Sequence, residues 1–217
     1  MLPPLKNGDR LDQKTFHARY EAMPERVWAK LIGGIVYLSP PQKAPLGRMR
    51  VRVFHWLAGY EEATPGIEAL PHVTHILSEE SEVQPAVSLL IFPDKGGQTR
   101  EMDDYIDGPP EFIVETASST DAIELHAKRD DYERTGVREY VVVALRQARV
   151  FWFVSRNGQF EELAPGDDGI LRSEVFPGLW LDPAALLRHD TPRVQEVLQQ
   201  GLATPEHAAF VARLAGQ

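Results

Sequence analysis

The chain has 217 residues, of which 43% are hydrophobic and 25% charged, as in an ordinary globular protein with one sizeable core. It contains no cysteine, which excludes disulfides and thiolate metal sites. No apolar run is long enough to span a bilayer, and the first residues lack the apolar core of a signal peptide, so we expect a cytoplasmic protein.

The charge of the chain is acidic, with a formal net charge of −9 and a pI near 5.3. Affinity for duplex DNA rests largely on cations that neutralise its phosphates. The bulk charge therefore counts against nucleic-acid binding, although a local basic cleft could still provide it.

The first part of the chain predicts a helix, a hairpin and a second helix. Residues 12–23 place apolar side chains on one helical face, behind the candidate N-cap Asp12. Two apolar runs flank Gly33-Gly34, which is a hairpin signal. A proline-containing loop then leads into a helix over about 48–62, which the breaker Thr64-Pro65-Gly66 ends.

The middle of the chain predicts strands, over about 67–77 and 86–92. A loop with two glycines and several acids joins the second of them to a strand over 111–117. This last strand is an apolar run that ends at Glu115, as expected of a strand buried on both faces.

The next elements are a helix over 121–135, ended by Gly136, and a strand over 139–144. RVFWFVS and QFEELA then predict a hairpin across Asn157-Gly158, and VFPGLWLDP closes the sheet. This order predicts an α/β fold of the mixed α+β kind, in which helices flank a mixed central sheet.

The last part of the chain is helical from residue 183 onward. The segments 183–188, 191–200 and 204–214 carry alanine and leucine at helical spacing and are broken at Gly201 and Pro205. They predict a small C-terminal helical appendage with a role in self-association.

Glu115 and Lys128 are the candidate chemical pair. Glu115 ends a strand, and open α/β sheets hold ligands at strand ends. Lys128 lies about two turns into the next helix, on the same face as Tyr132, and that helix could aim the lysine at the carboxylate. A carboxylate can hold Mg²⁺ for phosphodiester hydrolysis while a lysine stabilises developing charge. The spacing alone fits a solvated salt bridge as well.

Several segments carry a family resemblance: FHARYEAMP, LIGGIVYLSPP, APLGR, VQPAVSLLI, GGQTREMDDYIDGPPEFIVETASST, DAIELHAKRDDYERTGVREYVVV and RSEVFPGLWLDPAALL. In this order they resemble the Uma-type putative restriction endonuclease family, over nearly the whole chain. The resemblance implies the restriction-endonuclease-like PD-(D/E)XK core, DNA as substrate, Mg²⁺ or Mn²⁺ as cofactor, and a homodimer. We expect an endonuclease-like domain over 1–182, followed by the helical appendage over 183–217.

The resemblance assigns roles to individual residues. The family's strand-end glutamate is Glu115, which would bind the metal, and its catalytic lysine is Lys128. Ala117 stands where the wider superfamily has a lysine, and in this family the helix lysine takes that place. His126 resembles a family-typical position and is a candidate supporting partner of Lys128, although half-buried packing explains it equally well.

Three family positions hold different residues here. Ala86 follows Pro85 where the family has its principal metal-binding aspartate. Lys30 replaces a glutamate before the LIGG turn, and Leu46 replaces a histidine before the glycine of APLG. These losses predict weakened or absent metal-dependent hydrolysis and put the binding of Mg²⁺ or Mn²⁺ in doubt. We hypothesise that the Lys30 ammonium takes the vacated metal position and pairs with Glu115.

Two functions compete on this basis. The first is the family's DNA hydrolysis, weak or absent in this chain. The second is a non-catalytic, homodimeric binding or regulatory protein that keeps the nuclease fold. Asp94, Asp103 and Asp104 are candidate replacement ligands, although loop acids more often only keep a loop solvated. His72 and His75 would point to opposite faces of a strand, so we expect structural or surface roles for both.

Overall fold

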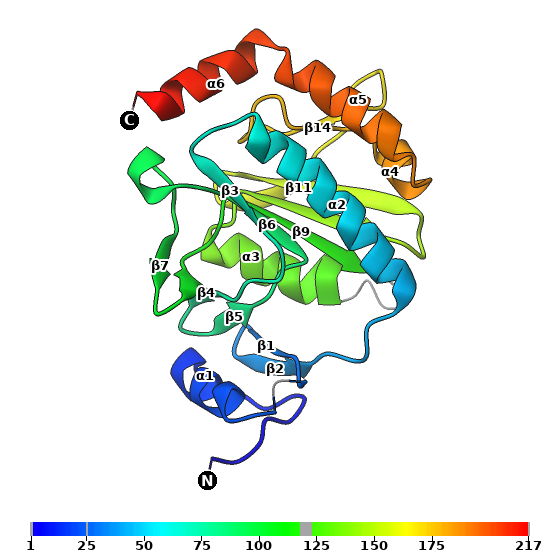
Figure 1. Ribbon diagram of the computed structural model, residues 1–217. Coiled ribbons are helices and arrows are strands. Elements are labelled where there is room, and N and C mark those ends of the chain that lie inside the picture. Colours follow the sequence, from blue (N-terminus) through cyan, green and yellow to red (C-terminus); the bar gives the residue numbers. More distant parts are fainter. Residues whose placement is uncertain (1, 25, 118–122, 217) are drawn as a thin grey trace.

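Two six-stranded sheets form the framework of the molecule (Figure 1). The structure, a computed structural model, describes residues 2–24, 26–117 and 123–216. The strands are β1 Ala29–Ile32, β2 Ile35–Leu38, β3 Ile67–Leu70, β4 His75–Ser78, β5 Ser81–Val83, β6 Val87–Ile91, β7 Arg100–Met102, β8 Tyr105–Asp107, β9 Phe112–Ala117, β10 Glu139–Ala144, β11 Arg149–Arg156, β12 Gln159–Glu162, β13 Leu171–Arg172 and β14 Trp180–Leu181.

Both large sheets are mixed. Sheet A has the order β2-β1-β5-β4-β8-β7, and its parallel pair is β4 with β8. Sheet B has the order β12-β11-β10-β9-β6-β3, and its parallel pair is β9 with β10. A helical crossover joins the parallel strands of sheet B, as parallel neighbours require. Strands β13 and β14 form a separate short ribbon.

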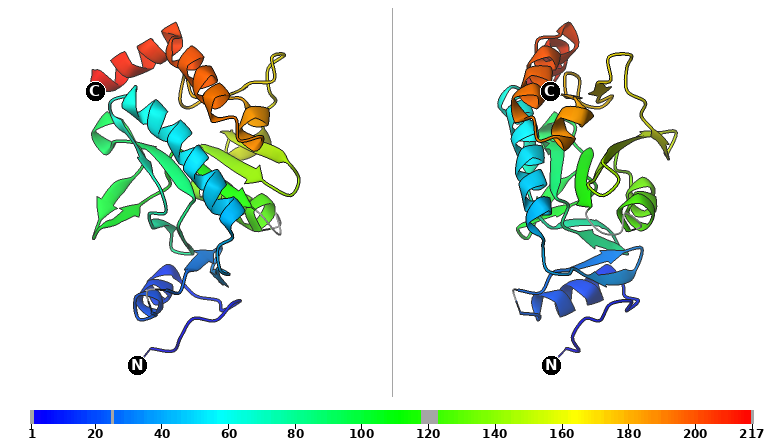
Figure 2. Two further views of the ribbon diagram at one scale, coloured as in Figure 1. Left: turned by 45° about the vertical axis from the view of Figure 1, so that its right-hand side comes forward. Right: turned by 90° about the vertical axis from the view of Figure 1, so that its right-hand side faces the viewer.

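Helices cover both faces of sheet B (Figures 1 and 2). The turned view of Figure 2 shows α2 along one face and α3 along the other. The helices are α1 Gln13–Glu21, α2 Ala44–Glu62, the 3₁₀ turn η1 Pro93–Lys95, the π-helical turn η2 Ile123–Lys128, α3 Arg129–Thr135, α4 Pro183–Leu187, α5 Thr191–Leu202 and α6 Pro205–Ala215. Within the described ranges, none of these helices combines the length and apolarity needed to cross a membrane.

The mixed α+β fold predicted from the sequence is confirmed, with two large sheets where a single central one was expected. The Asp12 side chain accepts a hydrogen bond from the Thr15 N–H and caps α1 as predicted. The hairpin across Gly33-Gly34 is β1–β2. Helix α2 begins at Ala44, four residues before the predicted start, because Pro45 is well tolerated in a first helical turn.

Two segments in the middle of the chain differ from the prediction. Residues 67–77 are not one strand, because the chain breaks at Pro71 and at His72, whose φ is +56°, and β3 and β4 join different sheets. The predicted loop after β6 contains the β7–β8 hairpin, which turns at Asp103-Asp104 with φ of +52° and +67°. Aspartate tolerates this left-handed conformation better than most residues, so an Asp-Asp pair can make a tight hairpin turn.

The predicted helix over 121–135 is present as η2 and α3, and its first two residues lie outside the described part of the chain. Gly136 ends it with a φ of +95°. Toward the C-terminus, the predicted break at Gly201 is wrong, because α5 continues through this glycine. A Cβ at Gly201 would lie 2.2 Å from the Gly178 carbonyl oxygen, so the glycine permits close packing of α5.

Sheet B separates two apolar clusters. The larger one lies between the sheet, α2 and the C-terminal helices, which contribute Val194, Leu198 and Phe210 to it. The helices after residue 182 thus help to cover sheet B, and the division of the chain into two domains at this point stays a prediction. The second cluster lies between the other face of sheet B, α3 and sheet A. Helix α1 covers the outer face of sheet A with a third cluster around Phe16.

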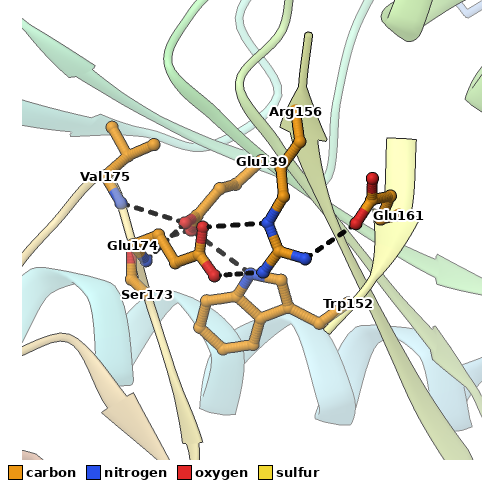
Figure 3. A network of polar contacts seen from close by, with 7 residues as sticks. All are labelled: Glu139, Trp152, Arg156, Glu161, Ser173, Glu174 and Val175. Carbon is orange, nitrogen blue, oxygen red and sulfur yellow. Dashed lines mark hydrogen bonds and ion pairs between the residues drawn. The ribbon is translucent and has the colours of Figure 1, made fainter. Parts of the chain in front are cut away.

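Glu139 begins β10 and is fully buried. Its carboxylate accepts four hydrogen bonds: from Trp152 Nε1 (3.2 Å), Ser173 Oγ (2.7 Å), and the backbone N–H groups of Glu174 (2.6 Å) and Val175 (3.0 Å). Figure 3 shows this network beside Arg156, which forms exposed ion pairs with Glu161 and Glu174. The buried carboxylate therefore fastens the loop before β14 to sheet B.

Candidate functional site

Glu115 lies on β9, in the middle of sheet B, with 3% of the residue exposed. It lies two residues from both Ile113 and Ala117 and shares their face of the strand, so its side chain points to the face that α3 covers. The antiparallel register pairs Val87 of β6 with Val114, and one step further along places Ala86 opposite Glu115. A methyl group therefore lies opposite Glu115, at the position where the resemblance implies an aspartate.

Lys128 and Tyr132 contact the Glu115 carboxylate from the crossover helix. Lys128 Nζ donates a hydrogen bond to Glu115 Oε1, and the two charged groups form an ion pair. The Tyr132 hydroxyl donates to the same oxygen at 3.2 Å. Lys128 is 2% exposed, and Tyr132 is fully buried. The predicted convergence of the strand-end acid and the helix amine is thus present in the structure, whereas the catalytic and metal-binding roles assigned to them stay predictions.

Lys30 and Arg50 add two further positive charges. Burial alone raises the pKa of Glu115, but Lys128 first and Lys30 second outweigh it, so the pKa lies below its ordinary value. Arg50 contributes in the same direction. Its Nε donates to Thr116 Oγ1 at 3.2 Å, from α2 on the opposite face of sheet B. The Lys30 charge thus acts on the Glu115 carboxylate, and the hypothesis that its ammonium takes the vacated metal position stays a prediction.

The other predicted site residues lie in different settings. Leu46 is buried in the first turn of α2. His126 is exposed on η2, and its supporting role stays a prediction. Asp103 and Asp104 lie in the β7–β8 turn at the edge of sheet A, three strands away from the β1 strand of Lys30. Asp94 is exposed in the turn η1.

Arg50 and His72 did not emerge from the sequence as parts of this site. The signal for Arg50 was the basic run RMRVRV in α2, where alternate arginines fall on different helical faces and do not indicate which one turns inward. His72 stands in the break between β3 and β4. Its pKa is lowered by desolvation and then by Arg50, while Glu115 acts in the opposite direction.

The residues around Glu115 do not fit Mg²⁺ or Mn²⁺. These ions prefer oxygen ligands, usually one or two carboxylates together with substrate phosphates. Here the Glu115 carboxylate already accepts hydrogen bonds from Lys128 and Tyr132. The residue opposite it is an alanine, and two more cationic side chains act on it. Over the described part of the chain, no three histidine, aspartate or glutamate side chains come together as a metal-binding group.

A cavity of about 190 Å³ lies elsewhere, beneath α1 on the outer face of sheet A. Its lining includes His17, Glu21, Glu82 and Tyr105, and it shares no residue with the Glu115 site. The fully buried Glu82 accepts hydrogen bonds from Gln13 (2.8 Å) and from His17, which fasten α1 to β5. We interpret this cluster as structural.

Comparisons with known proteins place the chain in a family. Comparison with curated proteins finds no match. Among solved structures, the chain is similar to the crystal structure of a putative nuclease belonging to DUF820 from Anabaena variabilis ATCC 29413, with a TM-score of 0.56. The sequences are 13% identical, and the match covers 78% of this chain and 97% of that chain, so it shows the fold alone. The model of the Uma2 family, described as putative restriction endonuclease, matches residues 15–184, which is most of the chain. The chain therefore belongs to the Uma2 family of putative restriction endonucleases.

Proposed function

We propose that this protein is a DNA-directed member of the nuclease family in which metal-dependent phosphodiester hydrolysis is weakened or absent. One observation carries the proposal: the Glu115 carboxylate is engaged by Lys128, and Ala86 stands opposite it. Family membership makes DNA the expected substrate. Ala86 and Leu46 are both buried apolar residues, so neither can offer a ligand to a metal.

Electrostatics supports the loss of the metal. Lys30, Arg50 and Lys128 all act electrostatically on the Glu115 carboxylate, and these four groups together have a formal charge of +2. At an effective dielectric constant near 20, two unit charges about 4 Å apart interact by roughly 4 kcal/mol. A divalent cation entering this environment meets repulsion from three cations, with a single carboxylate to offset it.

A second candidate function is a non-catalytic binding or regulatory protein that retains the nuclease fold. The same positive charge favours it, since a site that repels Mg²⁺ attracts a phosphate. The homodimer that the family resemblance implies stays a prediction, and light scattering on the purified chain would test it.

Two measurements test the proposed function. Calorimetry during titration with Mn²⁺ measures metal binding, and incubation with plasmid DNA and Mn²⁺ measures cleavage. We expect no saturable binding and little cleavage by the wild-type chain. The double variant Ala86→Asp/Lys30→Glu removes one ammonium and adds two carboxylates, so we expect it to gain saturable Mn²⁺ binding. The matched control adds Glu115→Gln to this double variant, and it should lose the gain.

Wild-type Mn²⁺ binding that disappears on Glu115→Gln, together with metal-dependent cleavage, would show an intact nuclease centre and overturn the proposal. A double variant that folds but still binds no Mn²⁺ would also contradict it, because the substituted positions would then not be the missing metal ligands.

A further inference from the structure

Trp28 is a large aromatic side chain left in solvent, with 51% of the residue exposed. A tryptophan combines a large apolar ring with a polar N–H, and such side chains are enriched at binding interfaces. Its ring lies edge-on to the His72 ring, with 6.1 Å between the centroids and 73° between the planes. This contact covers only part of the indole.

Trp28 directly precedes β1, the strand that carries Lys30. Its carbonyl oxygen accepts from the Ser39 N–H and continues the β1–β2 register by one residue. Side chains alternate along a strand, so Trp28, Lys30 and Ile32 share one face. Ile32 packs in the cluster that also holds Ile113, the neighbour of Glu115 on the same face of β9. On this shared face, Ile32 lies in the buried core, Lys30 comes next, and Trp28 is exposed at the end.

His72 joins this aromatic edge to the Glu115 site. Its backbone N–H donates to the Pro85 carbonyl oxygen at 3.2 Å, next to Ala86. Its φ of +56° is uncommon for a residue other than glycine, and such conformations persist where the surrounding structure holds them. The imidazole lies within the electrostatic reach of Arg50, Glu115 and Lys128. The aromatic pair thus borders the cationic group.

An exposed aromatic face beside cationic side chains is the chemistry that recognises single-stranded nucleic acid. Bases stack on aromatic rings while cations follow the phosphates. Glu115 and Lys128 are nearly inaccessible, whereas Lys30 and Arg50 are partly exposed, so the latter two are the ones a phosphate can reach. A duplex keeps its bases stacked and depends on many phosphate contacts, which the net charge of −9 disfavours.

We propose that Trp28 and His72 hold an unstacked base of single-stranded DNA, while Lys30 and Arg50 bind its phosphates without a divalent metal. This inference rests on the proposed function and gives it a ligand. The former metal position binds phosphate, and the indole beside it stacks on a base without distinguishing one base from another.

Fluorescence anisotropy of a labelled oligothymidine with the full-length chain in EDTA tests the proposal. We expect saturable binding that added Mg²⁺ does not tighten, and weaker binding of a duplex of equal length. Trp28→Ala should weaken oligothymidine binding by about 5- to 150-fold. Trp28→Phe, which keeps an aromatic face, should retain most of the affinity.

Two controls separate base stacking from loss of structure. An abasic oligonucleotide keeps the phosphates, so wild type and Trp28→Ala should bind it equally. Phe54→Ala removes another exposed aromatic ring, on α2, and should leave oligothymidine binding unchanged. Lys30→Met should lower the salt dependence by about 0.7 in the slope of log K against log salt for each phosphate that the variant no longer neutralises.

Equal binding of oligothymidine by wild type and Trp28→Ala would overturn this inference, as would a preference for the duplex. Either result would leave the proposed function standing, since it requires only that metal-dependent hydrolysis is weakened. Conversely, Mn²⁺ binding at Glu115 with DNA cleavage would overturn the proposed function, whichever oligonucleotide Trp28 contacts.

Discussion

Replacing Glu139 by alanine is expected to lower the free energy of unfolding by about 3 to 5 kcal/mol. The variant leaves the indole N–H of Trp152, the Ser173 hydroxyl and two backbone N–H groups without the acceptor that they share. The indole N–H is buried and the other three donors are partly buried, so water replaces the lost hydrogen bonds only in part. Urea unfolding followed by circular dichroism measures the difference.

Two further variants define the origin of the effect. Glu139→Gln keeps one carbonyl acceptor but turns an amide group toward donors, so we expect a loss smaller than that of alanine. Glu161→Ala removes an exposed ion-pair partner of the neighbouring Arg156 (Figure 3). It should change stability little, because water and salt screen exposed ion pairs. A Glu139→Ala variant as stable as Glu161→Ala would show that water or another acceptor satisfies the four donors.

The ionisation of Glu139 predicts a pH dependence of stability. Burial, which disfavours the charged form, outweighs the four donors and raises the pKa of this carboxyl from 4.5 to about 7. Between these values the folded protein holds a proton that the unfolded chain has released. The stability from this group is therefore complete below pH 4.5 and is lost as the pH rises to about 7.

Urea unfolding of wild type and Glu139→Gln at several pH values isolates this contribution. We expect the stability of wild type relative to the variant to fall between pH 5 and pH 7, by up to about 1.4 kcal/mol per pH unit. A difference that grows with pH would mean that the donors hold the carboxylate in its charged form and that its pKa is not raised.

The sequence could predict those parts of the site that depend on neighbouring elements. A strand end followed by a helix brings Glu115 and Lys128 together, because the crossover must return over its own strand to reach the parallel neighbour β10. That Lys30, Leu46 and Ala86 depart from a family pattern is implied by the resemblance and not by the spacing of residues in this chain. The register of β6 against β9 gives Ala86 its place opposite Glu115.

The surroundings of the site depend on contacts that local patterns do not contain. Trp28 and His72 precede β1 and β4, which both belong to sheet A, and the sequence did not separate this sheet from sheet B. The break at Pro71 that divides the two sheets lies inside an otherwise continuous strand-like run. Arg50 comes from a helix on the opposite face of sheet B, so no periodicity within α2 could assign it to Glu115.

Removal of the Lys128 ammonium has the second large expected effect. Lys128→Met keeps the length of the side chain but leaves the Glu115 carboxylate buried without its main counter-ion. Breaking a buried ion pair from one side costs about 3 to 5 kcal/mol, and we expect the lower end because Tyr132, Lys30 and Arg50 still favour the carboxylate. The free energy of urea unfolding is the measurement.

The double variant Glu115→Gln/Lys128→Met distinguishes a paired charge from ordinary packing. It leaves neither buried charge unpaired, so we expect it to recover much of the stability that the single variant loses. Lys30→Met is the matched control, with a smaller expected loss because Lys30 is partly exposed and Glu115 keeps Lys128. A Lys128→Met variant as stable as wild type would mean that the ion pair contributes nothing to folding. Recovery in the double variant would instead show that the loss in Lys128→Met comes from the unpaired Glu115 carboxylate and not from the packing of the side chain.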